Sequence, residues 1–226
     1  MNRALVMLFT CVVAAALDGH TDVVAQTAVR YLVSITNMTR AQSFTPILVA
    51  THTRTVRVFA AGTAASPELR EVAEEGNIAP LMMLLRGLPL EVRDVTATTA
   101  LLTPGVTVSV EVMAAGPFDR LSLVSMLIPT NDAFIGLNGI VLPGSGDGLT
   151  LDLPAYDAGT ERNDERCASI PGPGFSECNG PGGGARIGGG EGAVTIHNGI
   201  RGAGDMRAAD RDWKNPVARV TIRLVP

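Results

Sequence analysis

The stretch GVTVSVEVMA, residues 105–114, alternates apolar and polar side chains over most of its length. Thr107, Ser109 and Glu111 alternate with valines that would share one face of an extended chain: Val106, Val108, Val110 and Val112. A period of two residues is typical of a strand with one face in the core and the other in solvent. The stretch therefore predicts a half-buried strand of an antiparallel sheet.

Similar runs recur along the chain, at residues 30–37, 56–60, 121–128, 149–153 and 220–224. Turn residues separate them at intervals typical of an antiparallel sandwich. The chain of 226 residues has 46% hydrophobic but only 4% aromatic residues, which indicates a core of branched aliphatic side chains. We therefore expect an all-β fold, an antiparallel β-sandwich formed by one domain over residues 26–226.

Two short helices are predicted between the strands. In SPELREVAEEGN, Ser66 is a suitable N-cap, Pro67 suits the first helical position, and Gly76 ends the helix. A second helix is expected over residues 80–86, ended by Gly87. Both are interpreted as caps over one end of the sandwich.

The amino terminus is typical of a signal peptide. Arg3 is followed by an apolar run, residues 4–17, that is too short to span a bilayer. The small residues at 23–25 suit a cleavage site, which assigns residues 1–25 to the signal peptide; cleavage after Ala16 is the alternative. The expected location is secreted or periplasmic, or at the cell surface, with no transmembrane span in the mature chain.

Cleavage would leave two cysteines, Cys167 and Cys178, which predict a disulfide in an exported chain. Closing so short a loop would stabilise the fold by roughly 3 kcal/mol. The alternative, a two-cysteine metal site, lacks further ligands at suitable spacing. Residues 171–192, rich in glycine and proline, predict a long surface loop; the alternative of a phosphate-binding loop lacks the Lys-Ser/Thr that would follow it.

Charge and motif content exclude several functions. Without residues 1–25 the chain has 18 − 1 = 17 basic and 22 − 2 = 20 acidic residues, a net charge of −3, so no nucleic-acid partner is expected. Nucleophile-elbow and His-Glu-x-x-His motifs are absent from the sequence. Only His52 and His197 would remain as histidines, 197 − 52 = 145 residues apart, so we expect no enzyme.

Two acidic residues are the better candidates for a site. In YDAGTE, Asp157 and Glu161 flank a glycine that allows the backbone to fold back, so both carboxylates could face one centre. Calcium prefers six to eight oxygen ligands from carboxylates, carbonyls and water. The alternative is a polar turn in which both acids are solvated and Asp157 bonds to its own backbone.

Two longer segments resemble one known family. RLSLVSMLIPTNDAFIGLNGIVLP (residues 120–143) and LDLPAYDAGTERNDE (residues 151–165) resemble the spondin N-terminal domain, the module of F-spondin and mindin-type matrix proteins and of exported bacterial proteins. The first has the family's Met-x-x-Pro-Ser/Thr-x-Asp pattern, and the second its Tyr/Trp-Asp-Ala-Gly-Thr-Asp/Glu pattern. Glu161 stands where animal members usually have Asp.

The resemblance implies a sandwich similar to C2 domains, with calcium bound by Asp132, Asp157 and Glu161 as metal ligands. It also implies a binding, adhesion or surface-associated module whose partner is an unknown protein or glycan. The alternative is a metal-dependent hydrolase that uses the same carboxylates, with His52 or His197 nearby.

Overall fold

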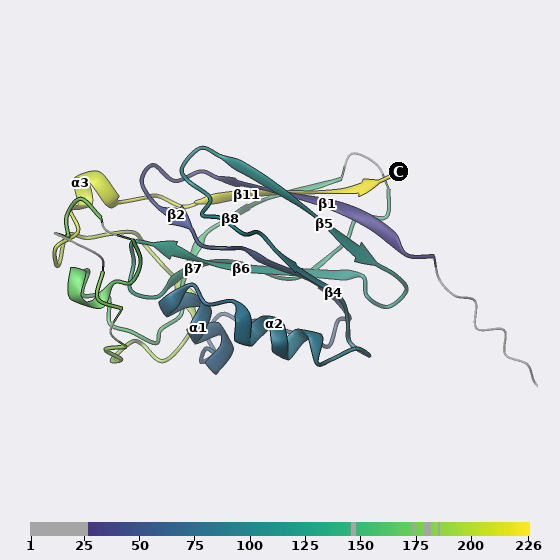
Figure 1. Cartoon of the computed structure of the whole chain (residues 1–226), viewed down its shortest axis with the longest axis horizontal. Coiled ribbons are helices and arrows are strands. Elements are labelled where there is room, and N and C mark those ends of the chain that lie inside the picture. Colours follow the sequence, from purple (N-terminus) through teal and green to yellow (C-terminus); the bar gives the residue numbers. More distant parts are fainter. Residues whose placement is uncertain (1–26, 146–147, 174, 179–181, 185) are drawn as a thin grey trace, which may run out of the picture.

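The chain folds into two antiparallel sheets packed face to face (Figure 1). The computed structural model describes residues 27–145, 148–173, 175–178, 182–184 and 186–226. The predicted signal peptide, residues 1–25, lies outside the described residues. The all-β sandwich predicted from the sequence is confirmed.

The smaller sheet has the strand order β5-β1-β11-β8. Its strands are β1 (Val29–Asn37), β5 (Thr107–Ala114), β8 (Leu149–Leu153) and β11 (Ala218–Val225). The alternating stretch that predicted the fold is β5, in which Val112 is buried and Glu111 exposed. Its register places Val110 opposite Val33 of β1.

The larger sheet has the order β10-β9-β7-β6-β3-β4, with β2 paired to β6. Its strands are β2 (Ser43–Phe44), β3 (Leu48–His52), β4 (Val92–Ala97), β6 (Arg120–Ile128), β7 (Ala133–Val141), β9 (Ala155–Asp157) and β10 (Thr195–Ile196). The central strand β6 is buried along almost its entire length because both faces of the sheet are covered.

Aliphatic side chains fill the space between the sheets, as the composition predicted. This core includes Val33 and Ile35 of β1, Leu123 of β6, Ile135 of β7 and Val220 of β11, each at most 1% exposed. Burying such side chains is the main stabilising contribution to a fold of this kind, about 2 kcal/mol for each.

The two predicted helices form, but they do not cap an end of the sandwich. Helix α1 (Pro67–Glu75) begins where Ser66 Oγ accepts a hydrogen bond from Leu69 N at 3.1 Å, and Gly76 ends it with φ +65°. Figure 1 shows α1 and α2 (Ala79–Arg86) lying along the outer face of the larger sheet.

A second apolar core explains that position. Leu69 and Val72 of α1 and Leu85 of α2 pack with Val124 and Phe134 of the sheet. The apolar faces of the two helices thus cover the outer face of β6 and β7. The periodicity of the sequence predicted the helices but not which face of the sheet they cover.

The strand predicted over residues 56–60 is wrong. Val56 and Val58 do pack into the second core, but this segment follows an irregular path with no strand pairing. Instead, Val58 N donates a hydrogen bond to Asn138 Oδ1 at 2.8 Å. The apolar residues of this segment are buried by contacts with the helices and the sheet, and not by pairing as a strand.

Long loops gather at one end of the sandwich, beyond the end of β6 and the start of β7 (Figure 1). They connect β9 to β10 and β10 to β11, and include a short 3-10 helix, Cys167–Ser169, and helix α3 (Ala208–Arg211). No helix in the described ranges is long and apolar enough to cross a membrane. The three predicted metal ligands all lie at this loop end.

Candidate metal centre

Asp132 lies in the turn between β6 and β7 and is fully buried. Its Oδ2 accepts hydrogen bonds from Thr160 N at 2.8 Å, Thr160 Oγ1 at 3.1 Å and Glu161 N at 3.0 Å. Its Oδ1 is buried with no hydrogen-bond partner. Asp132 therefore positions the loop after β9 with one oxygen and leaves the other for a further interaction.

Asp157 is the last residue of β9 and lies beside Asp132, because β9 pairs with β7 so that Asp157 is opposite Ala133. Asp157 Oδ1 accepts from Gly159 N at 2.7 Å, as the polar-turn interpretation predicted. Its Oδ2 accepts from Asn163 Nδ2 at 2.6 Å. The side chain is buried rather than solvated, which the polar-turn interpretation did not predict.

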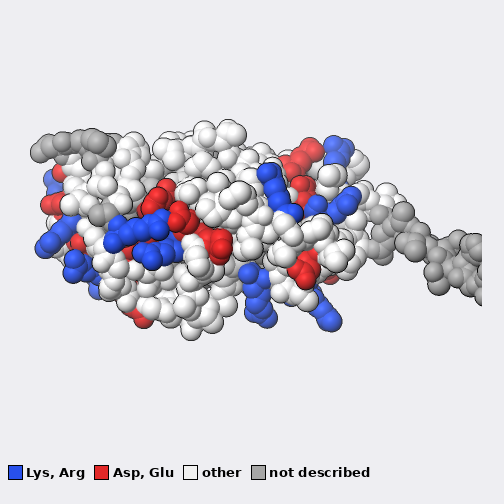
Figure 2. All heavy atoms as spheres, turned by 60° about the horizontal axis from the view of Figure 1, so that its bottom comes forward, with Lys and Arg blue, Asp and Glu red and all other residues white. Residues whose placement is uncertain are grey.

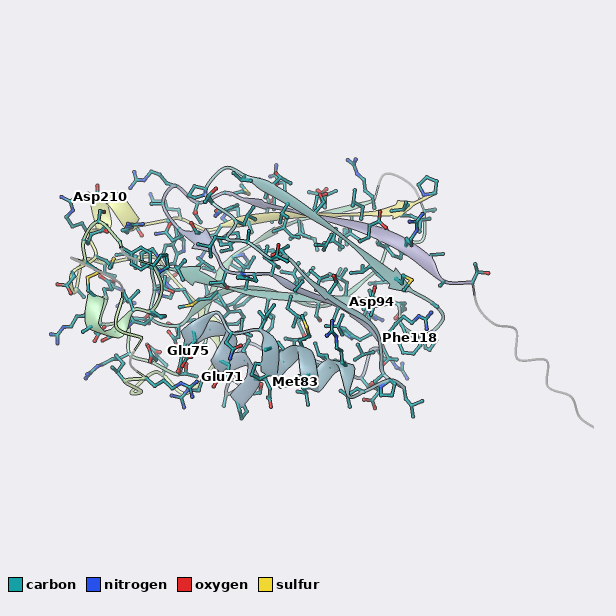
Figure 3. The ribbon with its side chains drawn as sticks, viewed as in Figure 1. Glu71, Glu75, Met83, Asp94, Phe118 and Asp210 are labelled. Carbon is teal, nitrogen blue, oxygen red and sulfur yellow. A yellow bond between two sulfur atoms is a disulfide. The ribbon has the colours of Figure 1, made fainter. Side chains whose placement is uncertain are left out.

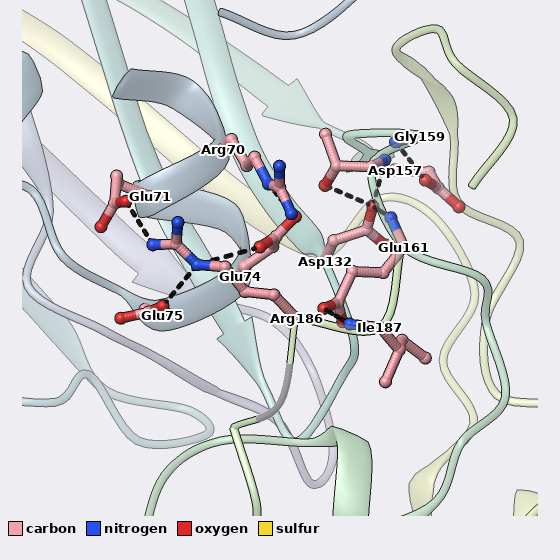
Figure 4. Close-up of polar contacts among 11 residues, drawn as sticks. Arg70, Glu71, Glu74, Glu75, Asp132, Asp157, Gly159, Glu161, Arg186 and Ile187 are labelled. Carbon is pink, nitrogen blue, oxygen red and sulfur yellow. Dashed lines mark hydrogen bonds and ion pairs between the residues drawn. The ribbon is translucent and has the colours of Figure 1, made fainter. Parts of the chain in front are cut away.

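Glu161 is also buried, but its carboxylate points toward the glycine-rich loop (Figure 4). Its Oε1 accepts from Ile187 N at 3.0 Å. Glu161 also forms an isolated antiparallel bridge with Gly189. The glycine-rich loop therefore lies against the carboxylates, and residues 186–193 form one wall of the site.

Glycines permit this close approach of two backbones. Gly159 has φ +68°, and a Cβ on it would clash with the backbone of Ala193. A Cβ on Gly190 would clash in turn with the backbone of Gly159 and Glu161. Gly192 N donates to Gly159 O at 2.8 Å, so the two segments are hydrogen-bonded as well as tightly packed.

Arg186 connects residues 186–193 to α1 by ion pairs (Figure 4). Its guanidinium forms ion pairs with Glu71 and, at 2.8 Å, with Glu75, and lies 3.6 Å from Glu74. Arg70 pairs with Glu74 at 2.6 Å. Glu71 and Glu75 lie toward the loop end of α1 (Figure 3). Three of the four acidic residues of α1, namely Glu71, Glu74 and Glu75, therefore form ion pairs within the molecule.

Acidic and basic side chains alternate on the face that carries α1 and α2, as Figure 2 shows. No broad basic patch is visible on that face.

Burial raises the pKa of all three predicted ligands. The pKa of Asp132 rises to about 7, first through burial and second through the Asp157 carboxylate, against hydrogen bonds that lower it. Burial also raises the pKa of Asp157, opposed by the hydrogen bond from Asn163. The pKa of Glu161 rises to about 7, mainly through burial. Ionising these groups together is therefore unfavourable unless a cation compensates.

The donor chemistry fits a hard cation, since all three side chains offer oxygen. The buried Oδ1 of Asp132 fits best because it has no hydrogen-bond partner. Over the described parts of the chain, no three His, Cys, Asp or Glu side chains are gathered closely enough to hold a metal ion as they stand. Glu161 points toward Ile187 rather than toward Asp157 (Figure 4), so the three-ligand assignment stays a prediction.

The two histidines lie in different places. In the pairing of β3 with β6, His52 lies opposite Arg120 at the start of β6, whereas Asp132 follows the end of that strand. His52 Nε2 bonds to Ser122 Oγ at 2.7 Å, deep in the fold. His197 is at the loop end, and its Nε2 lies 3.1 Å from Asn163 Oδ1.

The predicted disulfide between Cys167 and Cys178 is confirmed. It closes part of the loop end next to Asp205, whose Oδ2 accepts from Cys167 N at 2.9 Å. The predicted surface loop 171–192 is confirmed: it has no helix among its described residues, and almost all of these are at least partly exposed. Arg186 and Ile187 join it to α1 and to Glu161.

Several important residues were missed from the sequence. Glu165 is buried with φ +54°, and its carboxylate accepts from Arg201 N at 2.6 Å and Ala203 N at 2.7 Å. Asn163 and Arg186 were missed as well. Spacing carries no signal for Glu165 or Arg186, because their partners lie far away in the sequence; Asn163 has one near partner, Asp157, and one distant partner, His197.

A protein-family model matches this part of the chain. The family model described as Spondin_N, the spondin N-terminal domain, matches residues 35–165, more than half of the chain. The match includes Asp132, Asp157 and Glu161. No curated protein matches the chain.

Proposed function

The chain belongs to the spondin N-terminal domain family, and on that premise we propose that it is an extracellular binding module whose loop end is organised by one calcium ion. The family and the disulfide both support an extracellular location. We propose a protein or glycan as its partner and no enzymatic activity.

One observation carries the calcium proposal: Asp132 Oδ1 is buried without a hydrogen-bond partner, beside a second buried carboxylate, Asp157. An unpaired oxygen of this kind is costly in a protein interior. A calcium ion would satisfy it and would neutralise both carboxylates. Glu161 would complete the set of side-chain ligands by turning from Ile187, with backbone carbonyls and water as further ligands.

Calcium at this position would join three segments of the loop end. Asp132 comes from the turn between β6 and β7, Asp157 from the end of β9, and Glu161 from the loop that contacts residues 186–193. Fixing these segments would present their outer surface in one conformation. A preorganised surface binds a partner more tightly because less ordering is required on binding.

The hydrolase alternative receives less support. His52 belongs to the opposite end of β6. Both ring nitrogens of His197 are already hydrogen-bonded, to Asn163 Oδ1 and to Gly199 N. Neither histidine is placed to exchange a proton with a substrate at Asp132.

Calorimetric titration of the mature chain with calcium, together with elemental analysis, tests the proposal. We expect one calcium ion per chain. Asp132→Asn and Asp157→Asn should each weaken binding by at least tenfold. Asp152→Asn is the matched control, because Asp152 is partly exposed and paired with Arg219 at 2.7 Å on the other sheet. Absence of calcium binding in the unaltered chain would refute the proposal.

A further inference from the structure

A directed series of hydrogen bonds leads from the buried ring of His197 to the Asp157 carboxylate. Gly199 N–H donates to His197 Nδ1 at 3.1 Å, so Nδ1 is an acceptor and the proton is on Nε2. Nε2–H then donates to Asn163 Oδ1 at 3.1 Å. Asn163 Nδ2 donates in turn to Asp157 Oδ2 at 2.6 Å. Each bond fixes the direction of the next.

The His197 end of this series is rigid. The ring is 6% exposed and packs on Trp213, with ring centroids 4.9 Å apart. His197 N donates to Ala155 O at 2.9 Å, and Asn215 Nδ2 donates to His197 O at 3.1 Å. Burial, and then the charge of Arg201, lower the pKa of His197 to about 4, so the ring stays neutral near pH 7.

The Asp157 end is held from both sides. Oδ1 accepts from Gly159 N and Oδ2 from Asn163, which leaves each oxygen with a second lone pair. Donors on both oxygens fix the rotation of the carboxylate. In metal sites, partners of this kind orient the ligand, and their loss typically lowers metal affinity about 10- to 100-fold.

We propose that Asn163 and His197 are positioning residues that hold Asp157 in its cation-binding orientation and couple the site to Trp213. This inference rests on the proposed calcium site, because it assigns the residues that support one of its ligands. Neither residue would touch the ion. Both act through Asp157.

Coupling to Trp213 gives a direct spectroscopic test, because it is the only tryptophan in the chain. Calcium bound at Asp157 should change the electrostatic environment of Asn163 and His197 through these hydrogen bonds, and so change the emission of the indole packed against His197. Asn163→Leu should abolish this change while calorimetry still detects calcium binding. If calorimetry shows calcium binding to the unaltered chain but the Trp213 emission does not change, the proposed coupling is wrong.

A double-mutant cycle tests the positioning role. Asn163→Leu and His197→Phe should each weaken calcium binding about tenfold, and the double variant should be no weaker than the Asn163 variant alone, because both changes break one series. His197→Gln, which can both donate and accept, should restore part of the affinity. Asn138→Leu is the control, since it removes the acceptor of the hydrogen bond that Val58 N donates, away from the site.

Three results are distinguishable. Variants that bind calcium within twofold of the unaltered chain would overturn the positioning role and leave the calcium site intact. If the double variant loses calcium affinity by the product of the two single losses, the two residues act independently, and the positioning role is also overturned. Absence of calcium binding in the unaltered chain would overturn this inference and the proposed function together.

Discussion

Asp132 Oδ2 lies 3.0 Å from the backbone nitrogen of Glu161 and accepts its hydrogen bond, although the two residues are 29 positions apart. One proposed ligand thus sets the backbone position of another. The same oxygen accepts from Thr160, so the loop after β9 is built on a single buried carboxylate. The opposite oxygen of that carboxylate has no partner within the described structure.

Asp132→Asn should separate the structural role of this residue from its cation-binding role. Asn keeps an acceptor for the three donors and removes a buried charge. At pH 8, above the Asp132 pKa of about 7, we therefore expect its melting temperature in chelator to be no lower than that of the unaltered chain. The stabilisation by calcium should be lost. A variant that still gains full stability from calcium would contradict the assignment.

Gly159→Ala should be more destabilising than Gly62→Ala. Both glycines have positive φ, +68° and +80°, so each substitution costs about 1 kcal/mol of backbone strain. A Cβ on Gly62 meets no atom within 4 Å, whereas one on Gly159 clashes with the backbone of Ala193. Equilibrium unfolding in urea measures the difference. Equal losses would show that the two backbones are not in close contact.

Arg186→Met should loosen residues 186–193 from α1 without unfolding the sandwich. The substitution leaves Glu71 and Glu75 without their cation. Hydrogen exchange at Ile187 N, which donates to Glu161, should become faster. Arg219→Met is the matched control, because it breaks an exposed two-bond pair with Asp152 on the smaller sheet. Unchanged exchange in the Arg186 variant would contradict this fastening role.

Glu177 stabilises the disulfide-closed loop in a pH-dependent way. Hydrogen bonds from Arg211 at 2.7 and 2.9 Å lower the pKa of Glu177 to about 2. A lowered pKa means that the stabilisation is complete above the unfolded value, near 4.5, and is lost as the pH falls toward 2. Glu177→Gln should therefore cost about 2 kcal/mol at pH 7, as expected for hydrogen bonds to a charged group.

The test is the difference in free energy of unfolding between Glu177→Gln and the unaltered chain, measured across pH. It should be constant above pH 5 and shrink toward zero at about pH 2. A difference that stays constant down to pH 2 would contradict the ion pair.

Strands with alternating side chains and helices with clear capping residues could be predicted from the sequence. The alternating valines of β5 and the Ser66 cap of α1 were read correctly. Strand β3 was not among the runs predicted from alternation, because its sequence, LVATH, does not alternate apolar and polar side chains. The placement of α1 over β6 depends on a second core between them, which no periodicity along one segment reveals.

The candidate site was predictable only in part. A glycine between two acids indicated that Asp157 and Glu161 belong to one loop, while Asp132 came from family resemblance alone. Asn163 lies only six residues from Asp157, but its link to His197 spans 34 residues and could not be seen in the sequence. Arg186 was missed because its partners lie on α1, more than 100 residues earlier. Such contacts exist only once the sheets are assembled.

Melting of a chain of residues 26–226 in calcium and in chelator tests the central claim most directly. At a calcium concentration a hundredfold above Kd, binding should stabilise the fold by about 2.7 kcal/mol, a rise in melting temperature of about 5 to 10 °C. Asp157→Asn should remove that rise, and Asp152→Asn should keep it. Identical melting temperatures of the unaltered chain in calcium and in chelator would contradict the claim that calcium organises the loop end.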